Sequence, residues 1–319
     1  MDVAIADFFS IGYIIAAFGG GLFGASIGAL PAFFFTGFLV IAGEMVGVMG
    51  GEIDITGHIA FGAMFGPHIA FGGGVAAAAF AAKKGILDAG RDILTPPTKG
   101  GVRADFWQVL VVGGVFGVIG HLIRAVGEGV LALPTDNVAL AVFLSAVIVR
   151  LTLSPGKTGL LGKFDPNVAS SRMSLPEDRH NAWLPFHSRI ELLVLVGVFV
   201  GALSGWMSII TGSAFIGFGI SAASLVVLNS IGPISVTHHV TLPAALGALA
   251  VMAGTGNPVA GVIGGAVFGL IGALIGELGA RLFISWGDTH VDPPAFAIFI
   301  SWSLIMALSA ALPFMQWAL

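Results

Sequence analysis

The sequence predicts an all-α polytopic membrane protein, and three observations lead to this fold class. Of 319 residues, 56% are hydrophobic and only 9% are Asp, Glu, Lys or Arg, whereas soluble domains carry roughly 25% charged residues. Apolar runs of about 20 residues, the length that crosses a hydrocarbon layer of ~30 Å, recur along the whole chain. Glycine accounts for 48 residues, as expected where helices pack closely in lipid.

The apolar runs predict about 10–11 transmembrane segments. They cover residues 8–28, 30–50, 55–65, 67–83, 106–127, 137–153, 190–210, 211–231, 237–254, 257–283 and 294–316. The runs 55–65 and 237–254 are short and interrupted by Gly or Pro, so we expect broken or re-entrant stretches there.

The basic residues predict the orientation. Of the 13 Lys and Arg residues, five lie in 83–103 and six in 150–189. Because cytoplasmic loops collect Lys and Arg, we expect both loops on the cytoplasmic side of a multi-pass protein with a cytoplasmic N-terminus. The absence of cysteine excludes thiolate metal sites and cysteine nucleophiles. A net charge of −4 gives no reason to expect nucleic acid. The partners compatible with the sequence are the bilayer, a small ion or solute, and a second copy of the chain.

A weak internal repeat divides the chain into two homologous halves. The stretch GEIDITGHI, residues 51–59, aligns with GPISVTHHV, residues 232–240, so that Thr56 pairs with Thr237 and His58 with His239. The repeat predicts five spans in each half, with 137–153 as one extra linking helix. The expected domains are 1–130, the linking helix and cytoplasmic loop 131–189, and 190–319. Parallel and inverted arrangements both occur among transporters built from repeats, and the sequence leaves the choice open.

The two aligned stretches predict a polar site between the halves. Alternation of Ile53 and Ile55 is typical of an extended segment, and in a helix Asp54 and His58 would still be neighbours at i and i+4. Either geometry brings Asp54 and His58 together. If a pseudo-two-fold axis relates the halves, the two Thr-x-His stretches should meet.

The first half supplies the negative charge of this predicted site. Its acidic residues Glu44, Glu52 and Asp54 align with the uncharged Leu225, Pro233 and Ser235. Acids inside a membrane are costly without a partner, so a bound cation is expected. The predicted ion-binding residues are Glu44, Glu52, Asp54, Thr56, His58, Thr237 and His239. Asp54, His58 and His239 are further expected to ligate a divalent metal ion such as Zn²⁺.

Other polar residues in apolar surroundings are secondary candidates for the same function. They are His68, His238, Asp288, His290 and Asp292. Asp292 also has a structural interpretation, because an N-cap Asp followed by Pro is a helix start. Glu277 lies four residues before Arg281, a spacing that predicts an intrahelical ion pair.

Three functions are compatible with these residues. The first is a transporter or channel that moves a cation, or a small solute coupled to one, through the interface of the repeats. An intramembrane metal-dependent hydrolase is the second, with Glu44 or Glu52 activating a metal-bound water. A non-catalytic membrane subunit of a complex is the third. No residue is assigned a catalytic role, and a transport function is favoured because the histidines recur with the repeat.

Overall fold

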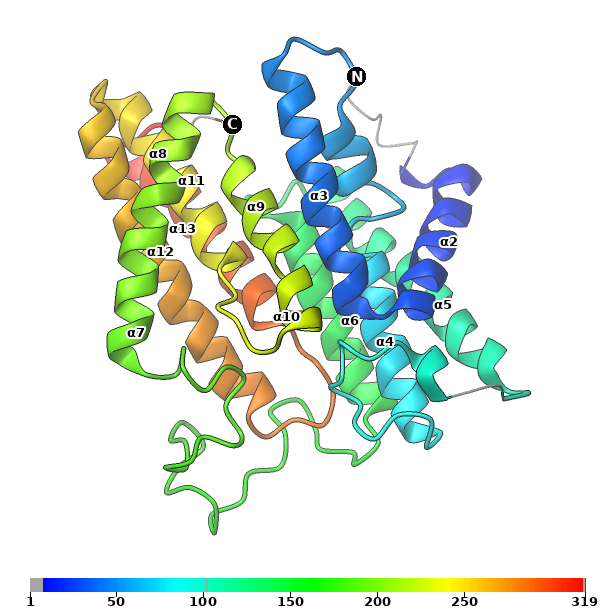
Figure 1. Ribbon diagram of the computed structural model, residues 1–319. Helices are drawn as coiled ribbons and strands as arrows, with labels where there is room; N and C mark the ends of the chain where they lie inside the picture. The colour runs from blue at the N-terminus through cyan, green and yellow to red at the C-terminus, as the bar shows by residue number, and fades with distance from the viewer. Residues whose placement is uncertain (1–7, 101–102, 318) are drawn as a thin grey trace.

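The computed structural model describes residues 8–100, 103–317 and 319, and in these ranges the chain is helical and contains no strand (Figure 1). The N-terminal helices are α2 (Ile11–Ile27), α3 (Ala29–Val48), η1 (Thr56–Ala60), α4 (Ala70–Lys83), η2 (Pro97–Gly100), α5 (Phe106–Arg124), η3 (Ala125–Val130) and α6 (Asn137–Leu153). The C-terminal helices are α7 (Ile190–Leu195), η4 (Val196–Val200), α8 (Gly201–Thr211), α9 (Ile216–Ser224), α10 (Val226–Ser230), α11 (His238–Thr255), α12 (Pro258–Gly279), η5 (Ala280–Ile284) and α13 (Pro293–Ala311).

Five helical runs in the described residues are long and apolar enough to cross a membrane. They are Ala29–Val48, Phe106–Val130, Ile190–Thr211, Pro258–Ile284 and Pro293–Ala311. Four shorter apolar helices accompany them: Ile11–Ile27, Ala70–Lys83, Asn137–Leu153 and Ile216–Leu228. The prediction of an all-helical membrane protein is confirmed at this level.

Glycine sets the helix spacing in the N-terminal bundle, where α2, α4 and α5 pack against one another. Gly21, Gly73 and Gly113 face each other so closely that a Cβ on any of them would clash with a neighbouring backbone. Close backbone approach of this kind is how small residues stabilise helix pairs in lipid. The α2–α3 turn also requires glycine, since Gly28 has a φ of +99°.

The C-terminal bundle is built in the same manner from α8, α11 and α12. Gly201, Gly265 and Gly269 form its closest crossing, where a Cβ would again meet backbone atoms. Asn257 caps α12 through its side-chain oxygen and Pro258 occupies the first turn, a start signal that is readable from sequence.

Helices α3 and α9 join the two bundles and lie side by side. Gly37 of α3 packs on Ala222 and Ala223, and Gly219 of α9 packs on Val40 and Ile41. Phe33 of α3 and Phe218 of α9 also line the central cavity described below.

The stretch between η1 and α4 is irregular. Residues 66–70 are buried, and irregular backbone at this depth needs partners from protein. Thr36 Oγ1 donates a hydrogen bond to the carbonyl oxygen of Phe65 at 2.7 Å, and Arg124 Nη1 donates to that of Phe61 at 2.6 Å. Residues 55–65 therefore form no separate span, and η1 is a single π-helical turn.

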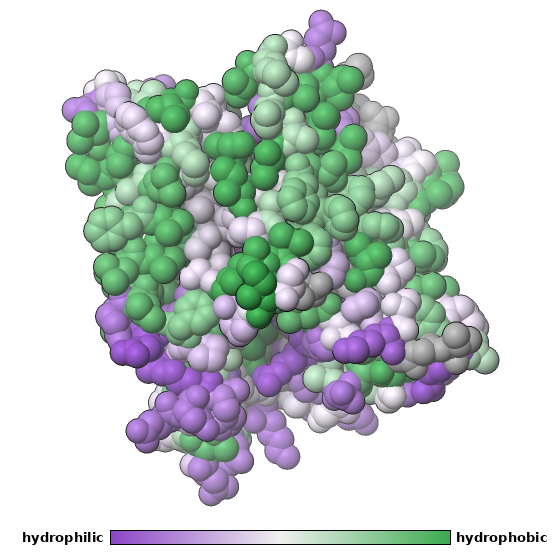
Figure 2. Space-filling view, in the orientation of Figure 1, coloured by the Kyte–Doolittle hydropathy of each residue, from purple (hydrophilic) through white to green (hydrophobic). Residues whose placement is uncertain are grey.

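The two basic loops lie at the same end of the molecule (Figure 1). Hydrophilic side chains gather at this end, and hydrophobic ones cover the helices (Figure 2). Helix α2 starts at the opposite end (Figure 1). Residues 1–7, on which the expectation of a cytoplasmic N-terminus falls, lie outside the described residues.

Candidate functional site

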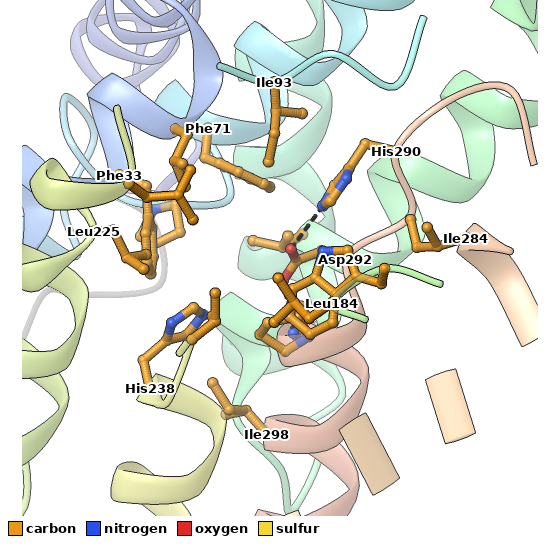
Figure 3. A pocket seen from close by; sticks show the side chains of 18 of the residues that line it. Phe33, Phe71, Ile93, Leu184, Leu225, His238, Ile284, His290, Asp292 and Ile298 are labelled. Atoms are coloured by element: carbon orange, nitrogen blue, oxygen red, sulfur yellow. Dashed lines mark hydrogen bonds and ion pairs between the residues drawn. The ribbon is translucent and has the colours of Figure 1, made fainter. Parts of the chain in front are cut away.

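A cavity of about 470 Å³ lies between the two bundles. Most of its wall is apolar and comes from N-terminal and C-terminal helices, including Phe33, Phe71 and Ile298 (Figure 3). Val142 of α6 also lines it. Its rim is formed by residues of the basic loops, among them the exposed Arg91 and Pro185. A largely apolar cavity of this size with a few polar groups is typical of small-molecule sites.

Asp292 and His290 supply one polar side of the cavity. Asp292 caps α13, accepting a hydrogen bond from the backbone N–H of Ala295 at 2.8 Å. Its other carboxylate oxygen lies 2.9 Å from Nε2 of His290 (Figure 3). The predicted capping role is confirmed, and the same carboxylate also lines the cavity.

Asp136 supplies a second carboxylate to the cavity. It caps α6 and accepts a hydrogen bond from the backbone N–H of Ala139 at 2.9 Å. Asp136 is not among the site residues predicted from the sequence. A signal was present, because an Asp and an Ala three residues later begin both α6 and α13, and Phe143 and Ser145 follow where α13 has Phe299 and Ser301.

His238 begins α11 and also lines the cavity (Figure 3). Its ring centroid lies 4.7 Å from that of Phe33 and 5.8 Å from that of Phe218. The side chain is 5% exposed, and its Nδ1 has no hydrogen-bond partner among the described residues. Of the five secondary candidates, three therefore meet at this cavity: His238, His290 and Asp292.

The primary candidates of the first half lie elsewhere, in a pocket of about 400 Å³ at the opposite end from the basic loops. We call it the outer pocket; it is lined by Gly43, Glu44, Gly47, Val48, Gly51, Glu52, Ile53, Asp54, Thr56, Thr211, Gly212 and Ser213. Within it, Glu44 accepts hydrogen bonds from Thr56 Oγ1 at 2.7 Å and from Ser213 Oγ at 2.5 Å. Glu44 thereby links α3 to η1 and to the α8–α9 connection.

Asp54 and His58 are neighbours, as their spacing predicts. His58 Nδ1 lies 3.5 Å from Asp54 Oδ2, and their side chains are 44% and 56% exposed, respectively. Asp54 also accepts a hydrogen bond from the backbone N–H of Gly57 at 2.7 Å. Both residues and Glu52 are open to the surroundings.

The second Thr-x-His stretch does not meet the first. Thr237 shares a hydrogen bond of 2.6 Å with Ser221. His239 is 1% exposed, packs at Gly276 of α12 and lies near Trp183, whereas His58 is exposed on η1. No group of three or more His, Asp or Glu side chains in the described residues could hold a metal ion, so Asp54, His58 and His239 do not form the predicted metal site. The prediction failed because the alignment of GEIDITGHI with GPISVTHHV does not correspond to equivalent places in the fold.

His68 is fully buried, and neither of its ring nitrogens has a hydrogen-bond partner among the described residues. Its backbone carbonyl oxygen packs on Gly120 of α5. The backbone carbonyl oxygen of His239 packs on Gly272 of α12 in the same way.

Asp288, the remaining secondary candidate, is hydrogen-bonded to the residues that follow α6 at the basic-loop end of the molecule. It accepts hydrogen bonds from Ser154 and Thr158 at 2.8 Å and from the backbone N–H of Gly156 at 2.6 Å. Partial burial raises the pKa of Asp288, but these hydrogen bonds and Arg150 nearby outweigh it and hold the pKa below its ordinary value. With its oxygens already engaged, Asp288 has a structural role.

Helices apolar enough to cross a membrane, a buried irregular stretch and a central cavity together indicate a helical membrane protein. The chain belongs to DUF7973, a family of unknown function, whose model matches residues 3–318. No curated protein and no solved structure matches the chain.

Proposed function

We propose that the protein is a membrane transporter that carries a small solute through the central cavity. The observation that carries this proposal is the position of the cavity, which is walled by helices of both bundles and reached from one end. Its volume of about 470 Å³ suits a small organic solute better than a bare ion. The outer pocket contains acidic residues that suit a cation entrance, but it shares no lining residue with the central cavity.

An interpretation of the fold as two halves of opposite orientation supports this mechanism. Helix α2 packs on α4 and α5 as α8 packs on α11 and α12. The tight contacts recur: Gly117 packs on Gly21 where Gly269 packs on Gly201. In Figure 1, α3 and α9 run in opposite directions between their bundles. An inverted repeat gives a transporter two related conformations, one open to each side.

The contacts support a repeat register different from the one read from the sequence. They pair His68 with His239, since the carbonyl oxygens of both pack on a glycine of the following helix. They also pair Asp136 with Asp292. In this scheme α6 matches α13 as the fifth helix of its half, which is an alternative to the extra linking helix expected for 137–153.

The described conformation is then open towards the basic loops and closed at the outer pocket. Residues of both basic loops form the cavity rim. At the other end, Glu44 holds α3, η1 and the α8–α9 connection together. If the basic loops are cytoplasmic, the conformation is inward-open and α2 begins on the outer side, opposite to the expectation from sequence.

Thiol labelling tests the proposal directly, because the natural chain has no cysteine. We expect Val142→Cys, on the cavity wall, to react with a membrane-impermeant maleimide from the basic-loop side in oriented vesicles. Ser170→Cys in the exposed loop is the positive control, and Val109→Cys, buried outside the cavity, is the negative control. If Ser170→Cys reacts and Val109→Cys does not, failure of Val142→Cys to react from either side would exclude a solute path through the cavity.

A further inference from the structure

We infer that the central cavity binds a lipophilic organic cation. This inference rests on the proposed function only in taking the cavity as the substrate site. It names the class of solute, which the transport proposal leaves open.

The first evidence is charge. Asp136 and Asp292 both line the cavity, and no ion pair joins Asp136 to a basic side chain in the described residues. Arg91 is the one basic residue among the described lining residues other than histidine, and it is exposed at the rim beside Asp92. The interior therefore carries two carboxylates without a strong cation, an arrangement that favours a positively charged ligand.

The second evidence is aromatic. Phe33, Phe61, Phe71, Trp183 and Phe218 line the same cavity. Aromatic faces attract cations, and cages of such rings recognise quaternary ammonium groups. Apolar walls also favour an organic cation over a hydrated metal ion, since a metal ion would need several oxygen or nitrogen ligands.

The third evidence is a polar atom on the cavity wall that has no partner within the described part of the chain. His238 lines the cavity with 5% of its surface exposed, and its Nδ1 has no hydrogen-bond partner among the described residues. A buried polar group normally has a partner. The His238 ring, which packs against Phe33, therefore marks a place on the cavity wall where a bound molecule would lie.

The helix starts argue against an anionic ligand. Helix N-termini attract anions, but those of α6 and α13 are already occupied by their own Asp136 and Asp292. The positive ends of both helices are thus compensated within the chain, and an added anion would meet two carboxylates.

Two probes of the same shape and opposite charge test the inference: tetraphenylphosphonium and tetraphenylborate. We expect saturable binding of tetraphenylphosphonium to the purified full chain, measured by equilibrium dialysis, and much weaker binding of tetraphenylborate. Asp136→Asn and Asp292→Asn should each weaken tetraphenylphosphonium binding by about tenfold or more. Asparagine retains the capping oxygen and removes only the charge.

Asp105→Asn is the matched control, because Asp105 also stands at a helix start but pairs with Arg103 outside the cavity. Equal binding of both probes, no binding of either, or unchanged affinity in both cavity variants would overturn the inference. The comparison of the two probes on the natural chain needs no variant to fold. If Val142→Cys is labelled while tetraphenylphosphonium fails to bind, the transport proposal is retained and the inference of a cationic ligand is rejected.

Discussion

The outer pocket and the central cavity both contain carboxylates, but they hold them in different surroundings. In the outer pocket, Glu52 and Asp54 are exposed, and Glu44 is hydrogen-bonded to two hydroxyl groups. In the cavity, Asp136 and Asp292 stand at helix starts among aromatic rings. Charge costs little at a wetted surface and much in an apolar interior.

The difference teaches that a dense group of acids in sequence need not be the site where charge acts on a ligand. The stretch GEIDITGHI is rich in polar residues between two apolar runs, and most of its residues are exposed. A single Asp before a helix is less conspicuous in the sequence. In apolar surroundings, however, its charge interacts more strongly with a ligand, because the effective dielectric constant is lower. The predictions that follow test this contrast from its largest effect to its smallest.

The largest effect is expected at Arg150, the buried basic residue of the helix that Asp136 begins. Its guanidinium donates to Thr289 Oγ1 at 2.6 Å and to the carbonyl oxygens of Thr289, Phe283 and Leu160. Arg150→Met should lower the free energy of unfolding by about 3–5 kcal/mol, because buried acceptors lose their donor. Thermal unfolding in detergent would measure this. As a control, Arg189→Met, at an exposed position, should lower the free energy of unfolding by no more than about 0.5 kcal/mol. Equal losses of stability in the two variants would contradict the expected difference between buried and exposed charge.

The next effect depends on pH and concerns His187, in the loop that lines the cavity rim. Burial lowers the pKa of His187 to about 4 from its ordinary 6.5. The unfolded chain then binds the proton more readily, so the stability that His187 contributes is present above pH 6.5 and is lost as pH falls towards 4. Melting temperature should fall over this window less steeply in His187→Gln than in the natural chain. Parallel curves would show that His187 does not contribute.

Asp292→Ala should destabilise the protein by about 1–2 kcal/mol, since it removes the cap of α13 and the hydrogen-bond partner of His290. Asp292→Asn should recover most of this loss, because its amide oxygen can still cap the helix. Chemical unfolding of the two variants would separate capping from charge. A loss of equal size in both variants would make charge, and not capping, the stabilising contribution.

Glu44→Gln should cost about 1 kcal/mol, because it weakens two charge-assisted hydrogen bonds. It should also increase labelling of Val142→Cys from the side of the outer pocket, if Glu44 holds that end closed. Rates of maleimide reaction from the two sides would show this. A rise from the basic-loop side alone would place the closure elsewhere.

The smallest effect is expected at Glu52. Glu52→Ala should change stability by no more than about 0.5 kcal/mol, as for most exposed substitutions, and should leave tetraphenylphosphonium binding unchanged. A strong loss of binding would move the site to the outer pocket.

The sequence predicted those parts of the fold that depend on local chemistry. Apolar length predicted the spans, Asp292 with its prolines predicted a helix start, and the spacing of Glu277 and Arg281 predicted an ion pair, which the structure shows at 2.7 Å. Each of these depends on residues a few positions apart, so the chain alone carries the information.

The sequence could not predict what depends on packing over long separations. His68 and His239 share an environment because the backbone carbonyl oxygen of each packs on a glycine of another helix, Gly120 of α5 and Gly272 of α12. No spacing along one segment reveals this. Asp136 was missed because its importance comes from facing a cavity that helices of both bundles create. The similarity of GEIDITGHI and GPISVTHHV was therefore weaker evidence for how the two halves align than the packing contacts of the glycines.

The crossing of α3 and α9 at Gly37 and Gly219 has a mechanical consequence. Each helix presents a glycine to the other, so only small contacts with Ala222, Val40 and Ile41 resist a change of crossing angle, and the crossing is suited to act as a pivot. Glu44 stands seven residues from Gly37, or about 10 Å along the helix. A tilt of roughly 20° at the pivot would swing Glu44 by roughly 4 Å, more than the reach of its bond to Ser213.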